Sequence, residues 1–109
     1  MRTPMIAGNW KLHKTIDEAL SLINELKPAV ANNSSVEVVV GPVYTALVKV
    51  AEAAAGSNIK VAAQNCYPEP SGAFTGEVSA PLLKDVGCDY VIIGHSERRQ
   101  IFGEPDELI

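Results

Sequence analysis

Four short apolar runs, rich in β-branched residues, recur along the chain and predict β-strands. They span residues 5–7, 36–40, 59–63 and 90–93. Each run is apolar at successive positions rather than at every second one, which is typical of strands in a parallel sheet that is covered on both faces. Segments with helical periodicity separate the runs.

The segment that follows Thr15 carries the clearest helical pattern. Thr15 and Glu18 match a capping box, in which each side chain satisfies a backbone N–H of the first turn. Apolar residues then recur at three- and four-residue spacing and form one stripe. Pro28 is predicted to end this helix, because the residue before a proline is pushed out of the helical region.

Three further helices are predicted, each with a glycine or proline at one boundary. They run from about residue 45 to Gly56, from an N-cap at Ser79 to Gly87, and onward from Pro105. The alternation of strands and helices predicts an α/β fold with right-handed parallel crossovers.

Composition narrows the class of protein. A length of 109 residues suits one domain, with 47% hydrophobic and 20% charged residues. The net charge of −4 argues against nucleic acid or an anionic membrane as the main partner. The N-terminus lacks the apolar core of a signal peptide, and no apolar run reaches the roughly 20 residues of a membrane-spanning helix. Cys66 and Cys88 form no close motif, so we expect a reducing cytoplasm rather than a disulfide scaffold or a zinc site.

Candidate chemistry lies after the strands, because parallel α/β folds bind ligands beyond the carboxyl ends of their strands. Asn9 and Lys11 follow the first run and could hold an anionic, oxygen-rich ligand; a turn asparagine beside a solvated lysine is the simpler interpretation of these residues alone. Residues 41–44, after the second run, are interpreted as a turn only. His13 is expected at the surface.

Gly94, His95, Ser96 and Glu97 follow the fourth run and form the most informative segment. Gly94 permits a sharp turn, and Ser96 is a plausible N-cap of a short helical turn. Backbone donors there oppose a positive charge on His95, so a neutral imidazole could donate to a carbonyl oxygen and transfer protons. A structural histidine is the alternative. Glu97 is expected to bridge to a cation such as Lys11.

The loop from Gln64 to Val78 is much longer than usual βα connections of about 2–6 residues. Phe74 near its tip is expected to bury against another subunit or against the base of the loop; an ordinary mobile loop is the alternative. Cys66 is interpreted as a small hydrophobic residue rather than a nucleophile. No nucleotide-binding glycine motif, hydrolase elbow or metal-ligand cluster is present, so neither a metal nor a cofactor is expected.

Taken together, four motifs resemble the N-terminal part of the triosephosphate isomerase family in order and spacing along the whole chain. They are residues 7–11, 63–65, 72–77 and 93–99. The resemblance implies an α/β fold of the TIM (β/α)8 barrel type, of which residues 1–109 would supply about the first four β/α units of a single domain. It also implies interconversion of dihydroxyacetone phosphate and glyceraldehyde 3-phosphate through an enediolate, in glycolysis and gluconeogenesis, without a cofactor.

The same resemblance implies roles for individual residues. Lys11 would neutralise charge on the phosphate and enediolate, and Asn9 would bind substrate oxygens and help to position Lys11. His95 would polarise the carbonyl and move a proton between the two oxygens, with Glu97 as a supporting residue. The contact loop of a homodimer would consist of Ala73, Phe74, Thr75, Gly76 and Glu77, and Thr75 would reach the neighbouring active site.

The family's catalytic glutamate and closing loop have no counterpart in these residues, since a barrel of this type needs roughly 250 residues. We therefore expect an open half-sheet with two unpaired edges, and a chain that is inactive and poorly folded on its own. Two alternatives stay open. The chain could act only as a folding or complementation fragment, or it could be a small doubly wound phosphate-binding module.

Overall fold

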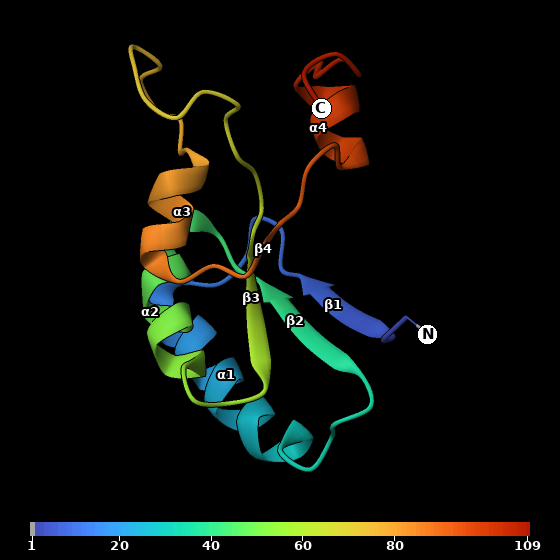
Figure 1. The fold of residues 1–109 in the computed structure, drawn as a ribbon. Coiled ribbons are helices and arrows are strands. Elements are labelled where there is room, and N and C mark those ends of the chain that lie inside the picture. Colours follow the sequence, from blue (N-terminus) through green and yellow to red (C-terminus); the bar gives the residue numbers. More distant parts are fainter. Residues whose placement is uncertain (1) are drawn as a thin grey trace.

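One parallel sheet of four strands forms the centre of the structure, a computed structural model that describes residues 2–109 (Figure 1). The strands are β1 (Met5–Asn9), β2 (Glu37–Gly41), β3 (Ile59–Ala63) and β4 (Tyr90–Val91). Their order in the sheet is β1-β2-β3-β4, so each strand pairs with the one before it in the chain. The predicted parallel α/β fold is confirmed, and the arrangement is that of the first units of a β/α barrel.

Three helices cover one face of the sheet. They are α1 (Ile16–Val30), α2 (Tyr44–Ala54) and α3 (Ala80–Val86), and they lie on the same side of the strands in Figure 1. Within residues 2–109 no helix lies on the opposite face, so the predicted cover is present on one face of the sheet. The opposite face points to the interior in a closed barrel, where side chains rather than helices fill the space.

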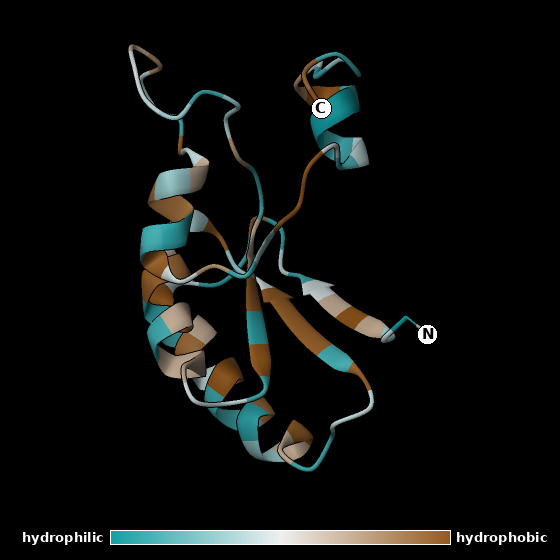
Figure 2. Ribbon diagram, in the orientation of Figure 1, coloured by the Kyte–Doolittle hydropathy of each residue, from teal (hydrophilic) through white to brown (hydrophobic). Residues whose placement is uncertain are grey.

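The hydrophobic core lies between the sheet and α1 and α2. Its largest fully buried side chains include Ile23 of α1, Leu47 and Val50 of α2, and Val61 of β3. Figure 2 shows the central strands as largely hydrophobic and the helices as alternating between hydrophobic and hydrophilic turns. The edge strand β1 lies outside this core, and 68% of Ile6 is exposed. The predicted open half-sheet is therefore present in the described part of the chain.

Helix α1 confirms its predicted start and corrects its predicted end. The Glu18 N–H donates to Thr15 Oγ1 over 3.3 Å and the Thr15 N–H donates to Glu18 Oε1 over 3.2 Å, which is the capping box. The helix continues through Pro28 to Val30. Pro28 lies in the last turn of α1. Proline has no backbone N–H, so one helical hydrogen bond is missing there, and the residues before Pro28 stay helical.

The fourth helix differs from the prediction. Helix α4 spans Ser96–Ile101, whereas the residues after Pro105 form only turns. The N-cap is His95 rather than Ser96, because the His95 ring accepts the free Glu97 N–H. Gly87 ends α3 in the left-handed region with φ 99°, as predicted, but Ser79 caps α3 without a side-chain hydrogen bond. No helix within residues 2–109 has both the length and the apolar character needed to cross a membrane.

Candidate active site

Residues from the carboxyl ends of β1, β3 and β4 line one cavity of about 270 Å³. The parallel register brings these ends together, since Asn9 is aligned with Gly41 and Ala63 with Val91. Asn9, Lys11, His95 and Glu97, the four residues expected to carry chemistry, all line this cavity. The topology of the sheet therefore brings together residues as far apart in the sequence as Asn9 and Glu97, which are 88 positions apart.

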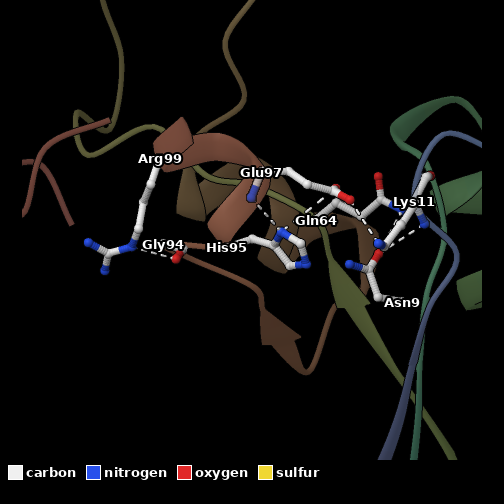
Figure 3. Close-up of polar contacts among 7 residues, drawn as sticks. All are labelled: Asn9, Lys11, Gln64, Gly94, His95, Glu97 and Arg99. Atoms are coloured by element: carbon white, nitrogen blue, oxygen red, sulfur yellow. Dashed lines mark hydrogen bonds and ion pairs between the residues drawn. The ribbon is translucent and has the colours of Figure 1, made fainter. Parts of the chain in front are cut away.

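Lys11 and Glu97, which both line this cavity, form an ion pair (Figure 3). Lys11 Nζ donates to Glu97 Oε1 over 2.7 Å, which confirms the expected bridge. The hydrogen bond and charge of Lys11 hold the pKa of Glu97 below its ordinary value. Both side chains are about half exposed, so the pair presents an ammonium group to the cavity rather than burying it.

Asn9 fixes the backbone of Lys11. The Lys11 N–H donates to Asn9 Oδ1 over 2.9 Å, a bond to the residue two positions earlier. Lys11 itself has φ 54°, in the left-handed region, which costs a non-glycine residue about 1–2 kcal/mol. Backbone strain of this kind persists where the surroundings enforce it. The side chain of Asn9 thus contacts the backbone of Lys11 directly.

Gln64 is a further residue of this site, for which the sequence indicates no individual role. Its Nε2 donates to the carbonyl oxygens of Lys11 over 2.8 Å and Gly41 over 2.9 Å, and it lies 3.5 Å from Asn9 Oδ1. One amide directly after β3 therefore ties the segment that follows β1 to the end of β2. The signal in the sequence is a polar amide directly after a buried strand. An amide in such a place needs hydrogen-bond partners within the protein.

His95 is held by a backbone donor at one ring nitrogen. The Glu97 N–H donates to His95 Nδ1 over 3.1 Å, so Nδ1 acts as the acceptor. In the neutral ring the proton then resides on Nε2, and this nitrogen is the donor available to a ligand. Glu97 Oε2 lies 3.7 Å from Nδ1, a separation that gives an ion pair only with a protonated ring. The backbone N–H of Glu97 thus occupies the lone pair of Nδ1.

Tyr44 lines the same cavity and corrects the interpretation of residues 41–44 as a turn only. It is the first residue of α2, and its hydroxyl donates to the carbonyl oxygen of Asn65. Burial raises the pKa of Tyr44 to about 12, so the hydroxyl stays protonated and keeps its role as a donor at neutral pH. The Gly41 carbonyl in this segment also accepts the Trp10 N–H over 3.0 Å.

The long loop projects away from the sheet and remains open to solvent (Figure 1). Phe74 packs against Tyr67 at the base of the loop, with ring centroids 4.5 Å apart, and 39% of Phe74 stays exposed. Ala73, Thr75, Gly76 and Glu77 are exposed as well. Of the two expected contacts, the one with the base of the loop is present and leaves part of the ring uncovered.

The two cysteines and His13 do not line the cavity. Cys66 and Cys88 are free thiols, and burial raises the pKa of both, which weakens them as nucleophiles. His13 is exposed, as expected. Within residues 2–109 no group of three or more His, Cys, Asp or Glu side chains is arranged to bind one metal ion.

Comparison with known proteins identifies the family that this chain resembles. The family model described as "Triosephosphate isomerase" matches residues 4–109. A protein of Pelobacter propionicus named "Triosephosphate isomerase" is 64% identical over 107 residues, which make up 98% of this chain and 43% of that protein. A protein of the same name from Trichlorobacter lovleyi is 64% identical over 109 residues, all of this chain and 43% of that protein.

More distant relatives give the same result. A protein of Endomicrobium trichonymphae, also named "Triosephosphate isomerase", is 53% identical over 109 residues and is covered to 44% of its length. The chain thus spans less than half the length of the curated relatives that it matches.

Proposed function

This chain belongs to the triosephosphate isomerase family, and we propose that its site serves the interconversion of dihydroxyacetone phosphate and glyceraldehyde 3-phosphate. The observation that carries the proposal is the convergence of Lys11, Glu97, His95 and Asn9 on one cavity at the carboxyl ends of the strands. An ammonium group, an amide and a neutral imidazole are donors suited to a phosphorylated hydroxycarbonyl compound.

Each donor has a defined part in this proposal. Lys11 offsets negative charge on the phosphate and on the enediolate oxygen that develops in the transition state. Asn9 binds substrate oxygens and holds the Lys11 backbone through its 2.9 Å hydrogen bond. The Nε2–H of His95 polarises the carbonyl, then transfers its proton between the two oxygens. Glu97 keeps the Lys11 ammonium at the cavity.

The reaction balances without an external oxidant or cofactor. One carbon of the substrate passes from carbonyl to alcohol while its neighbour passes from alcohol to carbonyl, so no electrons leave the molecule. A carboxylate base must take the carbon-bound proton and return it to the adjacent carbon. The matched residues contain no counterpart of that base, and Glu104 and Glu107 do not fit it. We therefore propose that the 109 residues act as part of a (β/α)8 barrel and are inactive alone.

The proposal includes a homodimer formed through the loop from Gln64 to Val78. Exposure of residues 73–77 and of part of the Phe74 ring supports a contact there. Thr75 at the tip would reach the active site of the neighbouring subunit. A cytoplasmic enzyme of glycolysis and gluconeogenesis, with a phosphorylated triose as substrate, completes this proposal.

A complementation fragment is the second candidate, and the open sheet favours it. The outer strands β1 and β4 each have an unpaired side among the described residues, and apolar side chains such as Ile6 and Ile93 are exposed there. The doubly wound module finds less support. Its strand order reverses at a switch point and its helices cover both faces, whereas this order is sequential and its helices cover one face.

A chimera tests the proposal directly. The 109 residues are fused to the part of the Pelobacter propionicus relative that the match does not cover, and isomerase turnover is measured. We expect turnover from the chimera and none from the 109 residues alone. Lys11→Met should lower kcat/KM by about 10²–10³-fold, because it removes charge stabilisation of the transition state. Lys49→Met, which removes an exposed cation of α2, is the matched control. A folded but inactive chimera would contradict the proposal.

A further inference from the structure

Arg99 holds both peptide groups that flank His95. Its side-chain Nε donates to the carbonyl oxygen of Gly94 over 2.7 Å, and its backbone N–H donates to the carbonyl oxygen of His95 over 3.1 Å. The first carbonyl belongs to the peptide before His95 and the second to the peptide after it. Arg99 Nη1 also pairs with Asp106 beyond α4. Figure 3 shows the Arg99 side chain on the far side of the turn from Lys11.

We infer that Arg99 is a positioning residue for His95, acting through the Gly94 carbonyl, with Asp106 holding its guanidinium group. The inference rests on the proposed function, since it assigns Arg99 to the placement of the group that polarises the substrate. Arg99 does not line the cavity, so it acts through the backbone and not on the substrate.

Within residues 2–109, buried apolar side chains do not hold this turn. Helix α4 has six residues and none of them is buried, so it lacks the apolar contacts that fix α1 and α2. Gly94 has φ 63°, in the left-handed region. Glycine adopts positive and negative φ about equally readily, so the residue itself does not fix the direction of the chain. A short exposed helix after a glycine requires other contacts to set its direction. The side-chain hydrogen bond from Arg99 to Gly94 is one of them, beside the Lys11–Glu97 and Arg98–Glu104 pairs.

The guanidinium group suits this task in a way that an ammonium group does not. Nε and Nη1 lie on a rigid planar fork, so one side chain reaches the Gly94 carbonyl and the Asp106 carboxylate at the same time. The side chains of Arg99 and Asp106 are 41% and 87% exposed. Exposed ion pairs contribute little to stability. Loss of this pair should therefore appear in the placement of His95 and not in global unfolding.

The experiment uses the chimera with Arg99→Met, Arg99→Lys and Asp106→Asn, and Lys49→Met as the control for loss of an exposed cation. Arg99→Met keeps the alkyl stem and loses both side-chain donors. We expect kcat to fall by about 10–100-fold with KM and the melting temperature unchanged, because a misplaced His95 affects only the transition state. Arg99→Lys, which reaches one partner at a time, should fall between Arg99→Met and the unmutated chimera, and Asp106→Asn should show a smaller loss.

A second measurement follows His95 itself. The ¹⁵N signals of the imidazole report which nitrogen carries the proton, and they do not require turnover. In the unmutated chimera we expect one tautomer with the proton on Nε2; in Arg99→Met we expect signals that average the two tautomers. The inference is overturned if Arg99→Met keeps the single tautomer or the kcat of Lys49→Met. An unmutated chimera that is inactive but has a fixed Nε2–H tautomer sinks the proposed function, while the tautomer comparison still decides the role of Arg99.

Discussion

The ammonium group of Lys11 lies 2.7 Å from the carboxylate of Glu97, although 86 residues separate the two in the chain. The pair joins the segment after β1 to the first turn of α4. The pKa of Glu97 is held below its ordinary value by the hydrogen bond and the charge of Lys11. A depressed pKa of an acid means that the interaction favours the folded state above the unfolded pKa and is lost as the pH falls through the folded pKa.

The first prediction concerns this titration. In the chimera, ¹³C NMR of the Glu97 carboxylate should give a midpoint below the ordinary value of 4.5 for glutamate. Lys11→Met should move the midpoint upward, because the donor and its charge are removed. Lys49 pairs with Glu52 on α2, so Lys49→Met should leave the Glu97 midpoint unchanged. An unmoved midpoint in Lys11→Met would show that the ion pair does not persist in solution.

The second prediction compares two glycines. Gly94→Ala should lower the free energy of unfolding more than Gly76→Ala in urea unfolding of the chimera. Both have positive φ, 63° and 93°, so both substitutions introduce backbone strain of about 1–3 kcal/mol. A Cβ at Gly94 would also lie 2.9 Å from Arg99 Nη2 and from Ile109 Cγ2, whereas no atom lies within 4 Å at Gly76. Equal losses would argue against the tight packing at Gly94.

The third prediction tests Gln64 as the tie between strands. Gln64→Glu replaces the amide donor by an oxygen that faces the carbonyl oxygens of Lys11 and Gly41. We expect a loss of about 1–3 kcal/mol in the free energy of unfolding at neutral pH, since two acceptors lose their donor. The exposed Gln100→Glu is the matched control.

The pH dependence of the Gln64→Glu loss has a defined sign. Facing carbonyl oxygens disfavour a carboxylate, so the pKa of the new glutamate is raised in the folded state. The loss should therefore be small below the unfolded pKa of about 4.3 and grow as the pH rises toward the folded pKa. Urea midpoints measured at acidic and neutral pH check this, and a pH-independent loss would contradict the explanation.

The fourth prediction concerns the open face of the sheet. The 109 residues alone should bind the dye ANS and associate in a concentration-dependent way, because apolar side chains such as Ile6 and Ile93 are exposed beside unpaired strand edges. The chimera should show neither effect at this face, since further strands would cover it. Light scattering and dye fluorescence measure the two properties. A monodisperse 109-residue chain without dye binding would contradict the expected exposure.

Local rules predicted much of the fold because several signals were independent of tertiary contacts. The capping box of Thr15 and Glu18 and the left-handed cap at Gly87 depend on neighbouring residues alone, and both are present. Pro28 and Pro105 depart from the predictions in opposite directions. A proline is tolerated in a last helical turn, and a proline at a favourable first position does not make the following residues a helix.

The site was predictable as a set of strand ends but not as a network. Position after a buried strand identified Asn9, Lys11 and His95, and the charges of the same segments indicated the pairing of Glu97 with a cation such as Lys11. No local pattern indicated that Gln64 would reach two neighbouring segments or that Tyr44 would face the cavity. Those contacts depend on strand register, which a single sequence does not encode in short-range spacing.

The sequential strand order has a consequence for synthesis on the ribosome. Each strand adds to the edge left by its predecessor, so β2 and β3 can dock as soon as they emerge, and the sheet never has to open to admit a later strand. The residues of the site are made at different times. Lys11 leaves the ribosome early, and its counter-charge Glu97 follows only after 86 further residues have been made. The scaffold can thus grow strand by strand, whereas the Lys11–Glu97 pair can form only after α4 has been made.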